Sequence, residues 1–325
     1  ALQIPNFGVG AWAWGDRLFW GYDEKQDADL RAGFETCVKG GVKLFDTAEL
    51  YGPGRSEELL GKFIKETNSD VLVATKFAAL PWRLGRGDVV AACKDSLKRL
   101  GKDTIDLYQI HFPGAWKNEA YWDGLGDCYE QGLVRAVGVS NYGSDAVRGV
   151  HRALKDRGIP LAANQIQYSL VYRYPELNGM KATCDELGVR ILAYSPLGLG
   201  ALTGKFSKDN LPFGPRKELA QKFVDDPGFG ELIKLMRAIG AQRGAGVTPS
   251  QVALAWCMAK GTTPIPGVRT VKQAEDNVQA LKLTLSSREV LDLDAAAAAC
   301  KEVLNPGINP MPKESVDTKA KFFEA

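Results

Sequence analysis

The fold is decided by three short apolar runs that each end in a polar side chain: Val42-Lys43-Leu44-Phe45-Asp46, Val71-Leu72-Val73-Ala74-Thr75-Lys76 and Ile105-Asp106-Leu107-Tyr108-Gln109-Ile110-His111. Runs of this length that are rich in β-branched residues are typical of buried parallel strands. Lys76 follows Asp46 by 30 residues and His111 follows Lys76 by 35, which leaves room for one helix and two loops in each interval. This spacing predicts an α/β fold, a (β/α)8 TIM barrel, in which side chains at the carboxyl ends of the strands converge on one site.

The rest of the chain continues the same alternation of strands and helices. We expect strands over residues 7–12, 43–45, 71–75, 105–110, 136–139, 163–167, 190–193 and 263–265. We expect helices over 27–39, 56–65, 88–100, 118–130, 144–155, 176–187, 231–242, 249–259 and 271–280, with an extra helix at 287–300. Eight βα units in order favour one barrel domain over residues 1–325, with roughly the last 20 residues as a C-terminal tail, rather than a doubly wound sheet.

Local signals set the ends of some elements. Gly40-Gly41 is expected to end the first helix, and Ser56, followed by two glutamates, to cap the start of the second. The segments 12–25 and 195–227 are expected to be long loops on the catalytic face. Loops longer than about 15 residues in a compact domain are usually functional or disordered.

Composition excludes several classes of protein. With 41 basic and 39 acidic residues the formal charge is +2, so we expect no nucleic-acid partner. No apolar stretch approaches the roughly 20 residues of a membrane span. The six scattered cysteines form no CxxC pair, which argues against a disulfide framework or a metal site and favours a reducing compartment. The chain begins at Ala1, so we expect that a presequence was removed or the chain was trimmed. A monomer is favoured, although no pattern identifies an oligomeric partner.

Four side chains, Asp46, Tyr51, Lys76 and His111, suit proton transfer to a carbonyl. Each one alone has an ordinary structural interpretation, such as a helix cap, a rim residue or a packed histidine, but four on consecutive strand ends indicate a site. A free phenol has a pKa of about 10, and a nearby ammonium lowers it. A carboxylate would hold the lysine, and a neutral imidazole would orient a carbonyl. Because no side chain can donate a hydride, a nicotinamide cofactor is required.

Sequence blocks along nearly the whole chain support this interpretation. Asp46-Thr47-Ala48-Glu49-Leu50-Tyr51-Gly52, with Ser56-Glu57 and Leu60-Gly61, resembles the signature of the aldo-keto reductase family. The blocks at 74–76, 107–111, 138–141, 164–165, 193–197 and 265–267 resemble later parts of the same family in the same order. Members of this family are NADPH-preferring (β/α)8 barrels that bind the cofactor without a Rossmann fold.

The resemblance implies a role for each matching residue. Tyr51 would donate the proton, Lys76 and Asp46 would tune it, and His111 would position the carbonyl. NADPH would be bound at the nicotinamide end, along the pyrophosphate and at the adenosine end by Trp12, Asp46, Ser140, Asn141, Gln165, Tyr194, Ser195, Pro196, Leu197, Lys205, Arg216, Gly267, Arg269, Gln273, Asp276 and Asn277.

One position departs from the family pattern. Many members carry a lysine where this chain has Gly267, so the 2′-phosphate must be held by other cations, for which Arg269 and Lys205 are the candidates. The glycine-rich run 198–205 misses the spacing of a phosphate-binding P-loop by one residue, and Phe206 replaces the required hydroxyl. We interpret this run as a mobile cofactor belt, with an ordinary glycine-rich loop as the alternative.

Further stretches resemble the plant and algal plastid branch of the family, which includes pyridoxal reductase. These stretches are 12–15, 76–83 and 195–205. The resemblance implies a chloroplast location, with the cytoplasm as the alternative, and pyridoxal or another plastid aldehyde as the substrate. A flat apolar substrate pocket would then be walled by Trp14, Trp20, Trp82, Phe112 and Trp116. The alternative for these rings is packing at the barrel rim.

Two other functions stay open at this stage. Barrels also place reactive lysines at strand ends, so Lys76 could form a Schiff base in a lyase. Outside enzymology, the chain could be an NADPH-binding regulatory module similar to the β-subunits of potassium channels, which resemble this family. Borohydride trapping of substrate on Lys76 would favour the lyase. Tight NADPH binding with negligible turnover of any carbonyl would favour the regulatory module.

Overall fold

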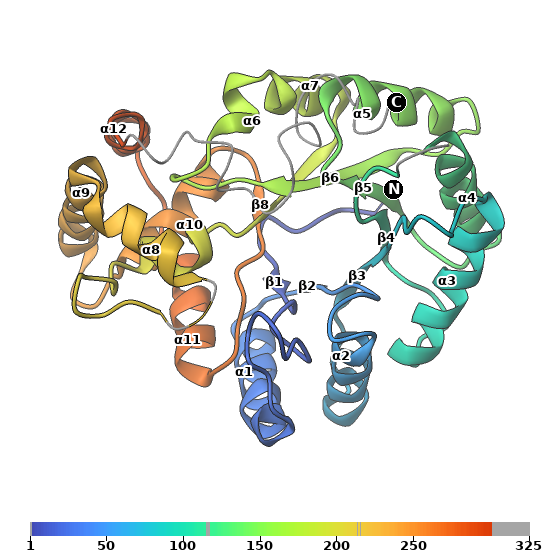
Figure 1. Ribbon diagram of the computed structural model, residues 1–325, viewed down its shortest axis with the longest axis horizontal. Coiled ribbons are helices and arrows are strands. Elements are labelled where there is room, and N and C mark those ends of the chain that lie inside the picture. Colours follow the sequence, from blue (N-terminus) through green and yellow to red (C-terminus); the bar gives the residue numbers. More distant parts are fainter. Residues whose placement is uncertain (1, 115–117, 213, 215, 301–325) are drawn as a thin grey trace.

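The computed structural model describes residues 2–114, 118–212, 214 and 216–300, and it shows a TIM barrel of eight parallel strands in chain order (Figure 1). The predicted (β/α)8 fold is therefore confirmed. The strands are β1 (Val9–Gly10), β2 (Leu44–Asp46), β3 (Leu72–Phe77), β4 (Leu107–Ile110), β5 (Val137–Ser140), β6 (Leu161–Gln167), β7 (Arg190–Tyr194) and β8 (Thr263–Pro264).

The first and last strands meet at a short seam that closes the barrel. The backbone N–H groups of Gly8 and Gly10 donate to the carbonyls of Pro264 and Pro266, both at 3.0 Å. A side chain on Gly10 would lie 2.9 Å from the carbonyl oxygen of Ile265, so only glycine lets the two segments approach this closely. Strand β1 covers only Val9 and Gly10 instead of the predicted 7–12, because its regular pairing with β2 is limited to these two residues.

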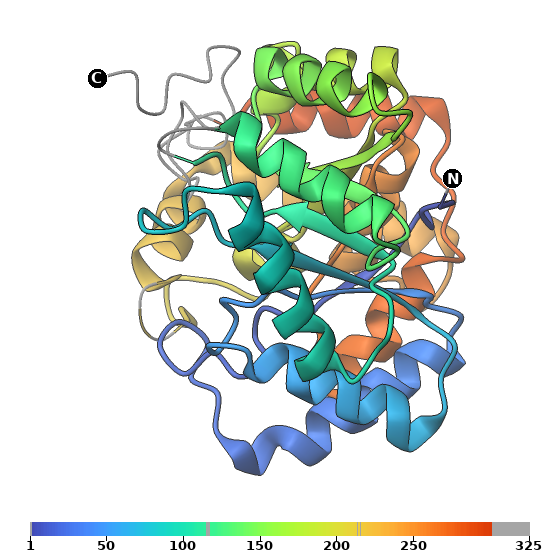
Figure 2. The same cartoon turned by 90° about the vertical axis from the view of Figure 1, so that its right-hand side faces the viewer.

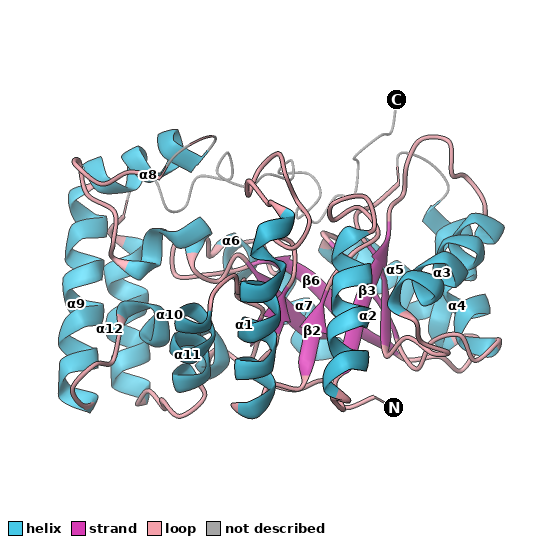
Figure 3. Cartoon of the chain, turned by 90° about the horizontal axis from the view of Figure 1, so that it is seen from below, coloured by secondary structure: helices cyan, strands magenta, loops and turns pink. Residues whose placement is uncertain are grey.

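Helices surround the barrel on the outside, as the side view in Figure 2 shows. They are α1 (Asp27–Lys39), α2 (Arg55–Thr67), α3 (Arg86–Leu100), α4 (Asn118–Glu130), α5 (Ser144–Lys155), α6 (Tyr174–Leu177), α7 (Met180–Leu187), α8 (Arg216–Asp225), α9 (Pro227–Arg243), α10 (Pro249–Ala259), α11 (Val271–Ala280) and α12 (Ser287–Ala298). Figure 3 shows α8 and the long loops at the end of the barrel opposite the N-terminus. The predicted C-terminal tail lies outside the described residues.

Three of the helix predictions need correction. The predicted helix 176–187 is two helices, because Gly179 adopts a left-handed φ of 80° between α6 and α7. The predicted loop 195–227 contains α8 and a 3-10 helix over Gly198–Thr203, neither of which its glycine and proline content suggested. Helix α9 begins at Pro227 rather than at residue 231, since Asp226 caps it by accepting from the backbone N–H of Gly228.

Ser56 is not the N-cap of its helix. Gly54, at a φ of 89°, occupies that position, and Ser56 is buried in the first turn of α2. Its hydroxyl donates to the carbonyl of Ala11 at 2.9 Å and accepts from the hydroxyl of Thr47 at 2.8 Å. The residue therefore joins the ends of β1 and β2 instead of capping a helix. By contrast, Gly40 ends α1 as predicted, with its N–H on the carbonyl of Thr36.

The barrel interior has an apolar layer below a polar one. A buried cluster contains one residue from or beside each of strands β2 to β7: Leu44, Ala74, Leu107, Ala136, Ala163 and Leu192. Two positions further along, strands β2, β3, β4 and β6 carry Asp46, Lys76, Gln109 and Gln165, all of them buried. Because side chains in a strand alternate in direction, this step of two keeps both layers inside the barrel. The polar layer lies toward the carboxyl ends of the strands.

All six cysteines are buried free thiols, which confirms the prediction that they form no disulfide framework. Within the described part of the chain, no group of histidine, cysteine and acidic side chains could hold a metal ion. No helix among the described residues is long and apolar enough to cross a membrane.

Candidate active site

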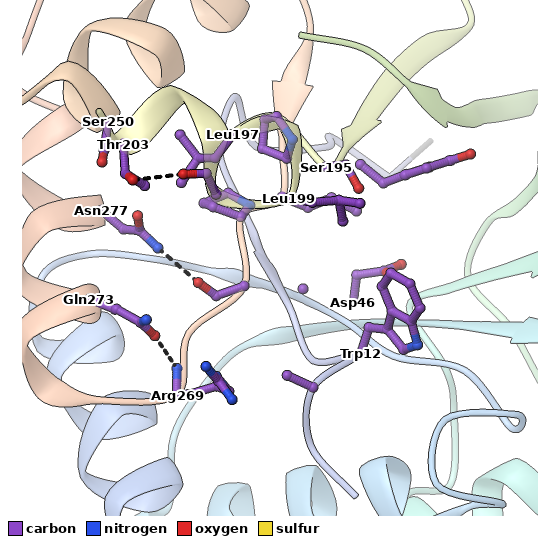
Figure 4. A pocket seen from close by; sticks show the side chains of 18 of the residues that line it. Trp12, Asp46, Ser195, Leu197, Leu199, Thr203, Ser250, Arg269, Gln273 and Asn277 are labelled. Atoms are coloured by element: carbon purple, nitrogen blue, oxygen red, sulfur yellow. Dashed lines mark hydrogen bonds between the residues drawn. The ribbon is translucent and has the colours of Figure 1, made fainter. Parts of the chain in front are cut away.

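A cavity of about 1120 Å³ opens at the carboxyl ends of the strands. Residues from both long loops line it, together with strand ends and the first turns of α10 and α11. Figure 4 shows Asp46 and Trp12 on one side of this cavity, with Arg269, Gln273 and Asn277 on the other. The two sides differ in chemistry.

Lys76 stands at the centre of the first side. Its Nζ donates to Oδ1 of Asp46 at 2.6 Å, to the carbonyl of Thr47 at 2.7 Å and to the hydroxyl of Tyr51 at 3.3 Å. The lysine and the aspartate are 0% and 2% exposed, so this ion pair is withdrawn from water. Of the four predicted catalytic residues, three line the cavity: Asp46, Tyr51 and His111. Lys76 does not line it and contacts the hydroxyl of Tyr51 from behind.

Asp46 receives hydrogen bonds from three strands. Besides Lys76 on β3, its Oδ2 accepts from Nε2 of Gln165 on β6 at 2.8 Å and from Nε2 of Gln109 on β4 at 3.4 Å. A buried carboxylate is costly unless such partners compensate the loss of hydration. The three donors therefore keep the carboxylate of Asp46 in one orientation.

The pKa of Tyr51 differs in direction from the sequence-based expectation. Burial raises the pKa of its hydroxyl well above the usual value, and the charges of Asp46 and Asp16 raise it further. Burial also lowers the pKa of Lys76, although the charge and hydrogen bond of Asp46 oppose this shift. The expected lowering by the ammonium is thus outweighed by burial. Tyr51 is protonated at neutral pH, which is the form that can give up a proton.

His111 lies beside Tyr51, with their ring centroids 5.6 Å apart and the planes at 81°. Burial, and then the charge of Lys76, lowers the pKa of His111 well below its usual value. The imidazole is therefore neutral near pH 7, as predicted. Its Nδ1 is buried and has no partner among the described residues.

A chain of hydrogen bonds joins the ends of β5, β6 and β7. The hydroxyl of Ser140 donates to the carbonyl of Gln165 at 2.8 Å, and Nδ2 of Asn141 donates to Oγ of Ser140 at 3.1 Å. Oδ1 of Asn141 accepts from the hydroxyl of Tyr194 at 3.0 Å. Asn141 adopts a left-handed φ of 60°, which asparagine tolerates better than most residues. These side chains form a polar wall of fixed geometry.

The second side of the cavity carries four cations, Lys205, Arg216, Arg269 and Lys272. In the part of the chain that the structure describes, none of them forms an ion pair with a carboxylate. Burial lowers the pKa of Lys205 and of Arg216, and the neighbouring guanidinium charges lower them further. Cations that repel one another in a cavity create a positive potential, which attracts anions.

The end of the cavity beside α11 is ordered by backbone and side-chain contacts. Oε1 of Gln273 accepts from the backbone N–H of Arg269 at 2.8 Å, and Nδ2 of Asn277 donates to the carbonyl of Gly267 at 3.4 Å. Oδ1 of Asp276 accepts from Thr248 and Gln251 at 2.8 and 2.7 Å. The segment 265–277 is therefore held against the start of α10.

Every residue predicted to bind the cofactor lines this one cavity. They are Trp12, Asp46, Ser140, Asn141, Gln165, Tyr194, Ser195, Pro196, Leu197, Lys205, Arg216, Gly267, Arg269, Gln273, Asp276 and Asn277. Their proximity is an observation, whereas their roles stay predictions at this point.

The aromatic substrate wall needs correction. Trp14 is 0% exposed in the core, where its Nε1 donates to the carbonyl of Val268 and its ring packs on Phe63, so its assignment is wrong. Trp82 is 74% exposed and does not line the cavity, so its assignment is also wrong. Trp20 and Phe112 do line the cavity. Trp116 lies outside the described residues.

Several site residues were missed at the sequence level. Gln109 precedes the end of β4, Ile110, by one residue, and only the inward step of two from Leu107 could have revealed it. Further polar residues that line the cavity stand near the starts of α10 and α11: Thr248, Ser250, Gln251, Thr270, Lys272 and Glu275. For these residues the polar N-terminal turns were the available signal.

Comparison with known proteins agrees with the fold and the cavity described above. The model described as "Aldo/keto reductase family" matches residues 6–298. Pyridoxal reductase, chloroplastic, from Arabidopsis thaliana is 46% identical over 314 residues, which cover 91% of this chain and 84% of that protein. The glycerol dehydrogenase structure from Gluconobacter oxydans is 26% identical, with a TM-score of 0.78 and 94% of each chain covered. An aldo/keto reductase from Klebsiella pneumoniae, solved with NADP and acetate, is 25% identical, with a TM-score of 0.70 and coverage of 90% and 91%.

Proposed function

The chain belongs to the aldo/keto reductase family of oxidoreductases, and we propose that it reduces an aldehyde or ketone to the alcohol with NADPH. One observation carries the proposal. The ammonium of Lys76 contacts both the carboxylate of Asp46 and the hydroxyl of Tyr51 at the bottom of a cavity whose far end is cationic. The first group of contacts suits proton transfer, and the cationic end suits a phosphorylated cofactor.

The residues present fit a phosphorylated dinucleotide. The cavity is about 1120 Å³ in volume, and Lys205, Arg216 and Arg269 supply positive charge without carboxylate partners among the described residues. Two buried donors there, Nε1 of Trp20 and Nε of Arg216, also have no partner among the described residues. An anion would satisfy both donors. When bound, NADPH supplies the hydride, which no side chain can provide.

The proton comes from Tyr51 in this proposal. Its hydroxyl transfers the proton to the carbonyl oxygen as the carbonyl carbon accepts the hydride, so the product is the neutral alcohol. Lys76, held by Asp46, stabilises the phenolate that remains. His111, neutral at pH 7, donates a hydrogen bond to the carbonyl oxygen and so orients the substrate.

The remaining predicted residues bind the cofactor in this proposal. Ser140, Asn141 and Gln165 hold the nicotinamide carboxamide, and Tyr194 stacks on the ring so that one face is presented. The segment 195–197 and the cations Lys205, Arg216 and Arg269 hold the phosphates, while Gln273, Asp276 and Asn277 hold the adenosine end. Arg269 takes the part of the lysine that Gly267 replaces in the family pattern.

Pyridoxal is the substrate that we propose first. The support is the 46% identity with the Arabidopsis protein named pyridoxal reductase, chloroplastic. Phe112 lines the cavity beside His111 and supplies an aromatic ring for contact with a planar substrate. The name of that relative is also the basis for proposing a plastid location. Residues 1–325 as one domain and a monomeric state stay predictions.

A panel of aldehydes tests the proposal with the purified protein. Pyridoxal, a nitrobenzaldehyde and a small aliphatic aldehyde are compared at saturating NADPH by the loss of NADPH absorbance. We expect turnover with all three and the highest kcat/KM with pyridoxal. Equal values for pyridoxal and nitrobenzaldehyde would reduce the proposal to a broad aldehyde reductase. Tight NADPH binding with negligible turnover throughout would favour the regulatory module instead.

The Schiff-base alternative loses support from the structure. Lys76 is 0% exposed, does not line the cavity and has its ammonium bound by Asp46, Thr47 and Tyr51. A Schiff-base lysine must reach its substrate as a free amine. Borohydride trapping of substrate on this residue would be needed to restore that hypothesis.

A further inference from the structure

Trp20 lies at the cationic end of the cavity rather than in a substrate wall. The guanidinium of Arg216 lies over its ring, 4.7 Å from the ring centroid, and that of Arg269 lies 5.6 Å from the same centroid. Nη1 of Arg269 also donates to the backbone carbonyl of Trp20 at 3.2 Å. One indole thus contacts two arginines that come from segments 53 residues apart in the chain. Cations over an aromatic face are attracted by the ring quadrupole.

The indole itself is held by other rings of the same loop. Trp20 packs edge-to-face on Trp12 at 5.5 Å and on Phe19 at 5.2 Å, and Trp12 stacks on Phe19 at 5.0 Å. Trp12 continues to Tyr51, with 6.3 Å between their centroids. Edge-to-face and stacked pairs of this kind restrict ring orientation. The position of Trp20 is therefore restricted by aromatic rings on the side toward Tyr51 and by the two arginines on the other side.

Donors at this end of the cavity remain unsatisfied. Nε1 of Trp20 and Nε of Arg216 are both buried, and neither has a partner among the described residues. A buried donor without an acceptor costs free energy, and these two lie beside two like charges. The side chains of Trp20, Arg216 and Arg269 all line the cavity. An acceptor that carries negative charge would satisfy the donors and offset the repulsion.

We propose that Trp20 is a cofactor-positioning residue, whose ring holds Arg216 and Arg269 side by side and whose Nε1 donates to an oxygen of a dinucleotide phosphate. The inference rests on the proposed function, because NADPH is the anion in question. It differs from the sequence-based prediction that Trp20 contacts the carbonyl substrate. It also gives a positioning role to an uncharged side chain that lies beside two guanidinium groups.

Two substitutions separate the two parts of this role. Trp20→Phe keeps an aromatic face but removes the N–H donor, whereas Trp20→Leu removes both. Trp82→Phe is the matched control, because Trp82 is exposed and does not line the cavity. Calorimetry measures the Kd of NADPH, and of 2′,5′-ADP as a probe without nicotinamide, for each protein. KM for a small aldehyde is measured at saturating NADPH.

We expect Trp20→Phe to weaken both ligands roughly 10-fold, the loss of one hydrogen bond to a charged group. Trp20→Leu should weaken them further, by roughly another 3- to 10-fold, because the face under the two guanidiniums is lost. Trp82→Phe should leave each Kd within about 2-fold, as for most exposed sites. The KM of the aldehyde should not change in the Phe variant.

The outcomes distinguish the inference from the function on which it rests. If the wild-type protein binds neither ligand, the proposed function and the inference are both wrong. If the wild type binds and turns over while Trp20→Phe and Trp20→Leu bind equally well, only the inference is wrong. An unchanged Kd with a raised KM for aldehydes would return Trp20 to the substrate wall.

Discussion

The two ends of the cavity satisfy their charged groups in opposite ways. Around Lys76 and Asp46, each charge meets protein partners at 2.6–2.8 Å and both side chains are almost inaccessible. Around Arg216 and Arg269, no carboxylate partner occurs among the described residues, and two buried donors have no acceptor there. The charges of Lys76 and Asp46 are paired within the chain, whereas we propose that an anion pairs with the two arginines.

The difference reflects what each end must do. Groups that stabilise charge during a reaction are most effective when they are oriented in advance, since no free energy is then spent on reorganising them. Groups that select a ligand gain affinity when that ligand supplies what the protein lacks. Internal pairing at the cationic end would weaken binding, whereas missing pairing at the Lys76 end would disorder the proton donor.

Removing the hydroxyl of Tyr51 should produce the largest effect, and it should affect turnover without affecting cofactor binding. We expect Tyr51→Phe to lower kcat by roughly 10²–10⁴-fold, the usual contribution of a general acid. The Kd of NADPH should stay the same, because the cationic end is untouched. Steady-state kinetics and calorimetry measure the two quantities. Near-normal turnover of several aldehydes by this variant would show that Tyr51 is not the acid.

Arg269→Ala should produce the converse effect. Losing a charge-assisted contact costs about 1.5–3 kcal/mol, so we expect NADPH binding to weaken by roughly 10- to 100-fold. NADH binding should change much less, because NADH lacks the 2′-phosphate, and kcat at saturating NADPH should hold. Parallel Kd measurements for both cofactors at fixed ionic strength check this. An unchanged NADPH-to-NADH ratio would remove Arg269 from the 2′-phosphate site.

Gln109→Leu should show whether the hydrogen bonds to Asp46 matter beyond Lys76. The substitution keeps the volume but removes the donor at 3.4 Å from the carboxylate. At 3.4 Å this hydrogen bond to the carboxylate is long and therefore weak, about 1 kcal/mol, so we expect kcat to fall roughly 5-fold with no change in cofactor binding. Gln165 cannot serve for this test, since it lines the cavity. Unchanged kcat would limit the proton-transfer group to Lys76, Asp46 and Tyr51.

The pH dependence should show the smallest change. The pKa of His111 is lowered, so the imidazole is neutral at and above pH 6, and the pKa of Tyr51 is raised, so the phenol keeps its proton through pH 9. We expect kcat for reduction, at saturating cofactor and substrate, to be flat from about pH 6 to pH 9. A change of kcat with a midpoint between pH 6 and pH 9 would contradict this expectation. If the change disappears in a His111 variant, the pKa of His111 is not lowered; if it disappears in a Tyr51 variant, the pKa of Tyr51 is not raised.

The end of the cavity around Lys76 and Asp46 was largely predictable, because its residues follow the two-residue period of a strand. Asp46 and Lys76 each stand two residues beyond an apolar inward position, and a step of two in a strand keeps the same face. Gln109 obeys the same rule but was missed, since it does not end its strand. Short apolar runs with polar ends therefore contained most of the information about this site.

The loops were less predictable because they have no such period. Trp12 and Trp14 are two residues apart, yet Trp12 lines the cavity and Trp14 lies in the core. Which indole faces inward depends on partners distant in sequence, such as Val268 for Trp14. Helix α8 was missed because glycine and proline around it indicated a loop. Its buried Ala220 and Phe223 stabilise it, and Phe223 packs on Phe229 of α9. Tertiary contacts decided both cases.

The three donors to Asp46 have a consequence for folding. They come from β3, β4 and β6, so a single carboxylate on β2 contacts strands that span much of the barrel circumference. A chain in which β6 has not yet docked lacks the bond from Gln165, which lies 119 residues away in sequence. Asp46 therefore acquires its final hydrogen-bond partners only when long-range strand pairing is finished. Recovery of turnover during refolding can thus serve as a kinetic signal for barrel assembly, independent of the optical signals of helix formation.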